Sequence, residues 1–263
     1  MNIGVMQGRL SPRLENKPYQ YFPIDTWKQE FEIAGSLGFD YIELIYDNSF
    51  GIYKFIDYVE EIITLTKKTG IKTTALCLDS FLSGINQETK IEDLMKVLSF
   101  GKKIGLKIIT LPYIETNNLE TQEDVDKLLE LLRVCEWTAE KNNIKICLEL
   151  DLPFEMYRKL GNNIRVTYDT GNYAYYKLGN SIIKYFNNQH VHIKDRLETG
   201  ESCLIGSGTV KWNEVLPILI NYNKIENFTL QGCRSNIYNS LEAEVNIVKQ
   251  QLNTFKEILK EIK

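Results

Sequence analysis

Three side chains able to ligate a divalent metal ion stand at or near the ends of apolar, β-branched runs in the second half of the chain. They are Glu149, Asp169 and His192. Two carboxylates and one imidazole suit Mn²⁺, Mg²⁺, Co²⁺ or Zn²⁺, and the side-chain carbonyl of Gln231 could supply a fourth oxygen. We therefore predict one divalent metal ion, bound without cysteine.

The chain contains only two histidines, so finding one of them in line with acidic residues is informative. His190 shares a strand face with His192, but the period of a strand puts it about 6.6 Å deeper. We expect His190 to pack or to support the ligands, and we leave it out of the metal site.

Polar residues interrupt apolar runs at other strand ends as well. Arg9 and Arg234 carry fork-shaped donors that suit a phosphate or a carboxylate. Either arginine could instead form an ion pair with Glu43 or Asp79, and both interpretations stay open. The residues predicted from these positions to bind substrate are Gln7, Arg9, Glu43, Asp79, Arg196 and Arg234.

The elements that must position these residues alternate between strand and helix. Predicted strands cover residues 2–8, 40–47, 71–79, 106–114, 144–150, 163–169, 190–195 and 227–233. Predicted helices cover residues 24–38, 51–70, 90–105, 121–143, 153–161, 174–187, 211–222 and 241–262. Apolar strands joined by helices indicate a buried parallel sheet, and eight units favour a closed (β/α)8 barrel of the α/β class. In such a barrel the carboxyl ends of the strands form the active site.

Composition places limits on the class of protein. The chain has 263 residues, 43% of them hydrophobic, and a net charge of -4, which is unsuited to nucleic-acid binding. No linker or shift in composition divides it, so we expect one domain over residues 1–263. The five cysteines lie far apart, mostly in apolar runs, and no segment has the pattern of a secretion signal or a membrane span. We expect a cytoplasmic protein that binds no membrane.

Several short segments resemble a known family. "GVMQGRLSP", "GFDYIEL", "YDTGN", "VHIKDR" and "GSGTVKWNEVL" are similar to strand-end motifs of the xylose isomerase-like TIM barrel superfamily, in its sugar phosphate isomerase/epimerase branch. The resemblance extends over essentially the whole chain. It implies a metal held by Glu, Asp, His and Glu from strands five to eight, which correspond to Glu149, Asp169, His192 and Gln231. It also implies a substrate contact at Asn172, which could instead cap a helix.

Gln231 departs from this pattern, and the departure bears on the chemistry. In related ketose epimerases two metal-bound glutamates remove and return the proton next to the carbonyl, but an amide cannot accept a proton. Glu149 is then the candidate single base for aldose-ketose isomerisation through an enediolate. Epimerisation would need a second base, Lys194 or Asp195 by position, although Lys194 could equally hold a phosphate or carboxylate.

The resemblance therefore predicts a metal-dependent isomerase or epimerase of a sugar or sugar phosphate, with Glu149 and Lys194 as catalytic residues. The opening motif together with "FTLQ" resembles members associated with surface-polysaccharide precursor synthesis. Two alternatives stay open: a metal-dependent dehydratase of a keto-polyol, and a barrel that binds a sugar without catalysis. The resemblance also leaves a homodimer open.

Overall fold

A computed structural model describes residues 1–47, 56–151, 159–161, 163–185 and 187–262. Its strands are β1 (Asn2–Met6), β2 (Tyr41–Ile45), β3 (Lys72–Cys77), β4 (Ile108–Tyr113), β5 (Lys145–Leu150), β6 (Arg165–Asp169), β7 (Asn187–Ile193), β8 (Asp195–Arg196), β9 (Ser202–Cys203) and β10 (Asn227–Leu230). Its α-helices are α1 (Trp27–Leu37), α3 (Val59–Thr69), α4 (Gln87–Ile104), α5 (Gln122–Asn142), α7 (Thr170–Tyr175), α8 (Asn180–Tyr185), α9 (Trp212–Pro217) and α10 (Leu241–Ile262). None of these described helices has the length and apolar character needed to cross a bilayer.

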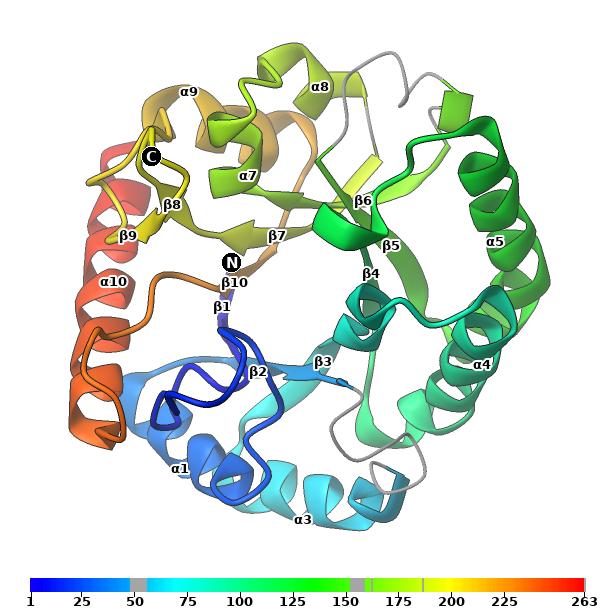
Figure 1. Cartoon of the computed structure of the whole chain (residues 1–263). Helices are drawn as coiled ribbons and strands as arrows, with labels where there is room; N and C mark the ends of the chain where they lie inside the picture. Colours follow the sequence, from blue (N-terminus) through cyan, green and yellow to red (C-terminus); the bar gives the residue numbers. More distant parts are fainter. Residues whose placement is uncertain (48–55, 152–158, 162, 186, 263) are drawn as a thin grey trace.

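Eight parallel strands of the described residues close into a barrel. They follow one another in chain order from β1 to β7, and β10 completes the ring by pairing with both β7 and β1. The helices form an outer ring around the strands (Figure 1). This arrangement confirms the predicted (β/α)8 barrel. Because the strands are parallel, their carboxyl ends meet at one end of the barrel, and the register sets Asp169 beside His192.

The helix ends follow local chemistry. α1 ends at Gly38, whose φ of 78° gives the left-handed turn that glycine adopts without a steric penalty. α5 begins with a capping box in which Thr121 and Asp124 bond each other's backbone N–H groups. Between strands and helices, large side chains such as Trp27 and Phe31 form the main apolar core.

The barrel interior is partly polar. The Tyr41 ring reaches into it past Gly4, where a Cβ atom would lie 2.3 Å from the ring. The Tyr41 hydroxyl bonds the Thr229 hydroxyl at 2.9 Å, and a similar bond joins Thr110 and Thr167. Hydrogen bonds between strands that are second neighbours in the ring therefore link the interior of the barrel beneath the strand ends.

The structure differs from the predicted elements in two places. The helix predicted over 174–187 is divided into α7 and α8, because Lys177 and Gly179 adopt left-handed conformations with φ of 54° and 74°. The segment after β7 contains the antiparallel pair β8 and β9 rather than only a loop. The predicted helix at 153–161 falls largely outside the described residues.

Candidate metal centre and substrate cavity

A cavity of about 490 Å³ lies at the carboxyl ends of the strands. Strand ends contribute Arg9, Asp79, Glu149, Lys194 and Gln231 to its wall. The other residues lining it are Lys17, Pro18, Tyr19, Gln20, Tyr21, Asp47, Leu82, Ser83, Pro112, Ile114 and Glu115. Five of the predicted site residues therefore share one space with the loop between β1 and α1.

Glu149, Asp169 and His192 converge at this end of the barrel. Each offers one ligand atom, these atoms all lie within 4.8 Å of one another, and all three residues are buried. His192 Nδ1 lies 3.5 Å from Glu149 Oε2. Among the described residues, Asp169 Oδ2, His192 Nδ1 and Gln231 Oε1 are buried and have no hydrogen-bond partner. Unpartnered oxygen and nitrogen atoms of this kind fit a divalent cation, which would satisfy them together.

The two carboxylate oxygens of Asp169 have different roles, one in capping a helix and one in the candidate site. As the N-cap of α7 it accepts a hydrogen bond from the backbone N–H of Asn172 at Oδ1, 2.8 Å away. Its Oδ2 lies 3.8 Å from Lys194 Nζ. The capping role considered for Asn172 thus belongs to Asp169, and the Asn172 side chain is buried with Oδ1 unpartnered.

Glu43 does not lie at the mouth of the barrel, where it was expected to bind substrate. It is fully buried, and its two oxygens are bonded by imidazole nitrogens: His190 Nε2 at 2.6 Å and His192 Nε2 at 3.1 Å. Burial raises the pKa of Glu43, but the two histidines outweigh burial and hold that pKa below its usual range. Both oxygens of Glu43 are therefore engaged by histidines, and burial keeps the carboxylate out of reach of a substrate in the cavity.

The position of Glu43 determines how His192 is presented. A hydrogen bond from Nε2 to Glu43 leaves Nδ1 as the ligand atom and fixes the ring, as carboxylates behind metal-bound histidines do. Burial lowers the pKa of His192, but Glu43 and Glu149 outweigh it and raise that pKa well above the ordinary value. His190 supports this arrangement, as expected, through Glu43 and Thr229.

Glu43, His190 and His192 also meet the geometry of a metal-binding group. In that group, however, both Nε2 atoms are already hydrogen-bonded to the carboxylate. The group formed with Glu149 and Asp169 has unpartnered ligand atoms instead. It is therefore the better candidate for a cation.

Asp195 is not available as a base. Its Oδ1 accepts hydrogen bonds from the backbone N–H groups of Arg196 and Val210, and its Oδ2 accepts from Gly206 and Gly208. The carboxylate is fully buried, and a Cβ atom at Gly208 would lie 2.2 Å from it. These four bonds hold the loop after β9, so the role of Asp195 is structural.

Lys194 and Arg196 occupy different surroundings. Lys194 lines the cavity, where burial lowers its pKa and Asp169 partly opposes that effect. The guanidinium of Arg196 stacks on Tyr175, with 5.5 Å between its central carbon and the ring centre. Arg196 is not among the described residues that line the cavity. Its predicted substrate contact is therefore not supported by its position.

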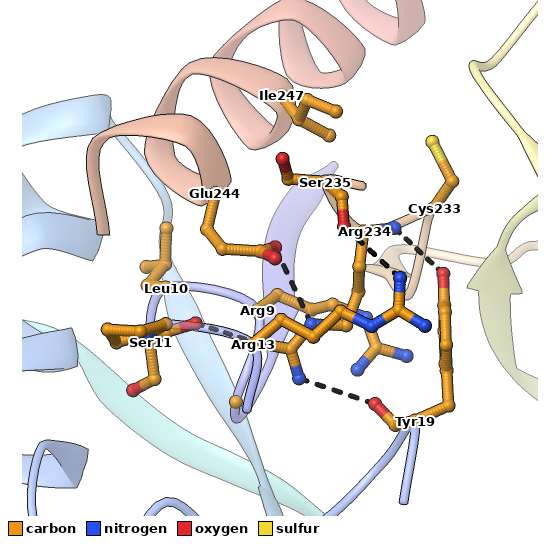
Figure 2. A network of polar contacts seen from close by, with 12 residues as sticks. Arg9, Leu10, Ser11, Arg13, Tyr19, Cys233, Arg234, Ser235, Glu244 and Ile247 are labelled. Carbon is orange, nitrogen blue, oxygen red and sulfur yellow. Dashed lines mark hydrogen bonds and ion pairs between the residues drawn. The ribbon is translucent and has the colours of Figure 1, made fainter. Parts of the chain in front are cut away.

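Arg234 is likewise not among the described residues that line the cavity. It donates hydrogen bonds to the backbone oxygens of Ser11 and Tyr19 and lies 3.5 Å from the Glu244 carboxylate (Figure 2). It is buried, and its ion-pair partner is Glu244 of α10 rather than Glu43 or Asp79. The expected substrate contact is thus replaced by a link between the loops after β1 and β10.

Two further contacts secure the ends of β1 and β10. Gln7 accepts a hydrogen bond from Ile45 N–H at 3.0 Å, which ties β1 to β2, and it does not line the cavity among the described residues. Gln251 of α10 bonds both the N–H and the carbonyl of Cys233, at 2.9 and 3.0 Å. Gln7 therefore has a structural contact where a substrate contact was expected.

Gln20 is the site residue that sequence reasoning missed. Its Oε1 accepts from Arg9 and from the Gln231 amide, at 3.2 and 3.3 Å, and its Nε2 donates to Asp79 at 2.9 Å. Burial raises the pKa of Asp79 to about 7, against the lowering effect of the Gln20 bond. The available signal was the place of Gln20 in a long loop after the first strand, where barrel enzymes position functional side chains.

The family follows from this fold and site. The chain belongs to the xylose isomerase-like TIM barrel family, whose model matches residues 31–257. Among curated proteins it is similar to L-ribulose-5-phosphate 3-epimerase UlaE of Escherichia coli O1:K1 / APEC and of Escherichia fergusonii. Each is 22% identical over 142 residues, 48% of this chain and 49% of the relative. The chain thus spans about half the length of the curated relatives it matches.

Solved structures share the architecture over the full chain. The IolI protein with a binding zinc atom is 14% identical, covers 100% of this chain and 99% of its own, and gives a TM-score of 0.72. D-psicose 3-epimerase in the presence of D-fructose is 16% identical, with coverage of 98% and 99% and a TM-score of 0.69. At sequence identities this low, the structural similarity shows that the chain shares the fold of these proteins.

Proposed function

We propose that this chain is a divalent-metal-dependent isomerase or epimerase of a sugar or sugar phosphate. It would remove a proton next to a carbonyl and pass through an enediolate. The convergence of Glu149, Asp169 and His192, with unpartnered ligand atoms on two of them, carries the proposal. The epimerases among the similar proteins support it.

The residues that would hold the cation are Glu149, Asp169 and His192, with the amide oxygen of Gln231 as a fourth ligand. The Gln231 amide donates from Nε2 to Gln20, which leaves Oε1 for that role. When bound, a divalent cation polarises a carbonyl and stabilises negative charge that develops on its oxygen.

Glu149 is the proposed base. The residue is 2% exposed and lines the cavity, so its carboxylate would meet a bound sugar with little competing water. A single carboxylate can remove a proton from one carbon and return it to the neighbouring carbon, which is isomerisation. Lys194 lines the cavity with its Nζ 3.8 Å from Asp169, and we propose that it acts in catalysis by stabilising negative charge on the substrate, without transferring the proton. Asp195 is excluded from this role by its four hydrogen bonds.

Arg9 and Asp79 are the predicted substrate-binding residues that line the cavity. We propose that they contact the hydroxyl groups or an acidic group of the sugar. We also propose a cytoplasmic enzyme of surface-polysaccharide precursor synthesis. The five cysteines, all free thiols, support a reducing location.

Proton exchange in D₂O tests the proposal directly. Metal-depleted and Mn²⁺- or Zn²⁺-loaded protein would be incubated with matched ketoses and ketose phosphates, and deuterium incorporation and new products would be followed by NMR. We expect exchange only with metal, and a loss of about 10²- to 10⁴-fold in Glu149→Gln. Exchange that needs no metal would refute the metal mechanism. No exchange with any sugar would favour a binding protein.

A further inference from the structure

Epimerisation needs a second proton-transfer group, and the residue after the last strand, Gln231, is not a carboxylate. Gln231 is an amide, which neither accepts nor releases a proton near neutral pH. Asp195 has all its bonding capacity occupied by four backbone N–H groups. Lys194 Nζ lies 3.8 Å from Asp169 and would share that carboxylate with the cation. Epimerisation therefore needs a proton donor from elsewhere in the wall.

Asp79 stands in the same wall, directly after β3. It lines the cavity and is only partly buried. One of its oxygens, Oδ1, accepts a hydrogen bond from Gln20 at 2.9 Å. No hydrogen bond to Oδ2 is present within the described residues. This oxygen is therefore free to meet a ligand in the cavity.

Gln20 connects Asp79 with the amide that replaces a carboxylate. Its Nε2 donates to Asp79, and its Oε1 accepts from Gln231 and Arg9. Gln20 thus separates the Arg9 guanidinium from Asp79, so no ion pair forces Asp79 to stay ionised. The charged groups that act on Asp79 are Glu149 and Asp47, which favour its protonated form, and Arg9, which opposes it.

We propose that Asp79 is a catalytic residue: it returns the proton to the carbon from which Glu149 removed one. Glu149 takes the C–H proton and becomes a neutral acid, and the electron pair of that bond passes into the enediolate. The Oδ2–H bond of Asp79 then breaks as the new C–H bond forms, which leaves Asp79 ionised. Exchange with water restores both groups, and the roles reverse in the opposite direction. This inference rests on the proposed function.

The raised pKa of Asp79, about 7, is consistent with this role, because both protonation states are then populated near neutral pH. Exposed carboxylates titrate near 4 and would hold almost no proton there. Glu115 provides a matched control. It lines the same cavity and is exposed.

The test compares Asp79→Asn and Glu115→Gln in the metal-loaded protein, by NMR in D₂O with a ketose on which the wild type acts. Asn keeps the acceptor for Gln20, so we expect the variant to fold. Asp79→Asn should retain exchange catalysed by Glu149 within a few-fold and lose epimer formation by at least about 100-fold. Glu115→Gln should keep the wild-type ratio of epimer formation to exchange. Epimer formation within tenfold of wild type in folded Asp79→Asn would overturn the inference.

A pH profile gives a second measurement that a structural role would not reproduce. Wild-type epimer formation should fall as the pH rises above about 7, because the protonated form of Asp79 is lost. In Asp79→Glu the pH at which epimer formation falls should shift, and part of the activity lost in Asp79→Asn should return. An unchanged pH profile would overturn the inference even if Asp79→Asn did not fold. Failure of the proposed function is distinguishable, because the wild type itself would then show no exchange.

Discussion

Two buried aspartates on neighbouring strand ends have opposite roles. Asp195, in the β8 and β9 region, accepts four backbone hydrogen bonds and holds a loop. Asp169, at the end of β6, accepts one backbone bond as a helix cap and leaves Oδ2 unpartnered beside Lys194. Both side chains are fully buried, so burial does not separate them. The two residues differ in the number of acceptor positions that remain unused. A buried acceptor without a partner lowers the stability of the fold unless a ligand satisfies it.

Matched asparagine variants would test this comparison with the largest expected effects. Asp169→Asn should keep the cap at Asn172 and remain folded, but lose at least about 100-fold in activity and metal affinity. In Asp195→Asn the side-chain NH₂ would face backbone N–H groups from which it cannot accept a hydrogen bond. The variant should therefore lose on the order of 3 kcal/mol of unfolding free energy.

Metal titration and urea unfolding of the same two variants would provide both measurements. If Asp169→Asn unfolded as readily as Asp195→Asn, Asp169 would be structural as well. Retained stability in Asp195→Asn would likewise remove the distinction between the two residues.

Glu43→Gln extends the comparison to a carboxylate engaged by two imidazoles. The amide can no longer accept hydrogen bonds from both histidines, so the His192 ring loses its fixed orientation. We expect the metal dissociation constant to rise about 10- to 100-fold, as measured by calorimetry.

Glu30→Gln serves as the control for Glu43→Gln. Glu30 is also buried, but it accepts backbone bonds from Gly8 and Leu10 instead of from a histidine. Its replacement should reduce stability and leave metal affinity unchanged. Equal metal affinity in Glu43→Gln and wild type would show that the carboxylate has no part in presenting His192.

Metal binding should release a proton from His192. In the metal-free protein the carboxylates raise the pKa of His192 above its ordinary value, so the imidazolium must lose its proton before Nδ1 can bind a cation. Metal affinity should therefore fall as the pH falls. Calorimetry in buffers of different ionisation enthalpy would count the released protons near neutral pH, and a count of zero would contradict this expectation.

Asp79→Asn, which should lose epimer formation, should have only a small effect on stability. The pKa of Asp79 is raised from 3.8 to about 7 in the folded protein. The associated stability is therefore present below pH 4 and lost as the pH rises through 7. In metal-free protein the variant should gain on the order of 1 kcal/mol at pH 8 and nothing near pH 4. Urea unfolding at both values would measure this, and an equal difference at both would contradict it.

The barrel and the convergence of Glu149, Asp169 and His192 were accessible to sequence reasoning for one physical reason. Parallel strands bring their carboxyl ends together, so polar residues that end apolar runs converge whatever their separation in sequence. That rule alone predicts that Glu149, Asp169 and His192 lie together.

The rule does not give depth or hydrogen-bond partners. Glu43 is buried inside the barrel, where its carboxylate is hydrogen-bonded by His190, a residue 147 positions later in the chain. Arg234 is paired by Glu244, and nothing in the local sequence of Arg234 marks that partner. Gln20 lies in an irregular loop without periodic pattern. These assignments depend on contacts between distant segments, which one sequence does not display.

The bonds from α10 to the loop after β10 also impose an order on synthesis. Gln251 and Glu244 hold Cys233 and Arg234, while the residues that would hold a cation on β5, β6 and β7 leave the ribosome earlier. A nascent chain would therefore carry its metal-binding groups before the enclosing wall is fastened. Seven of the eight barrel strands would by then be made, with the ring still open between β7 and β1 until β10 is added.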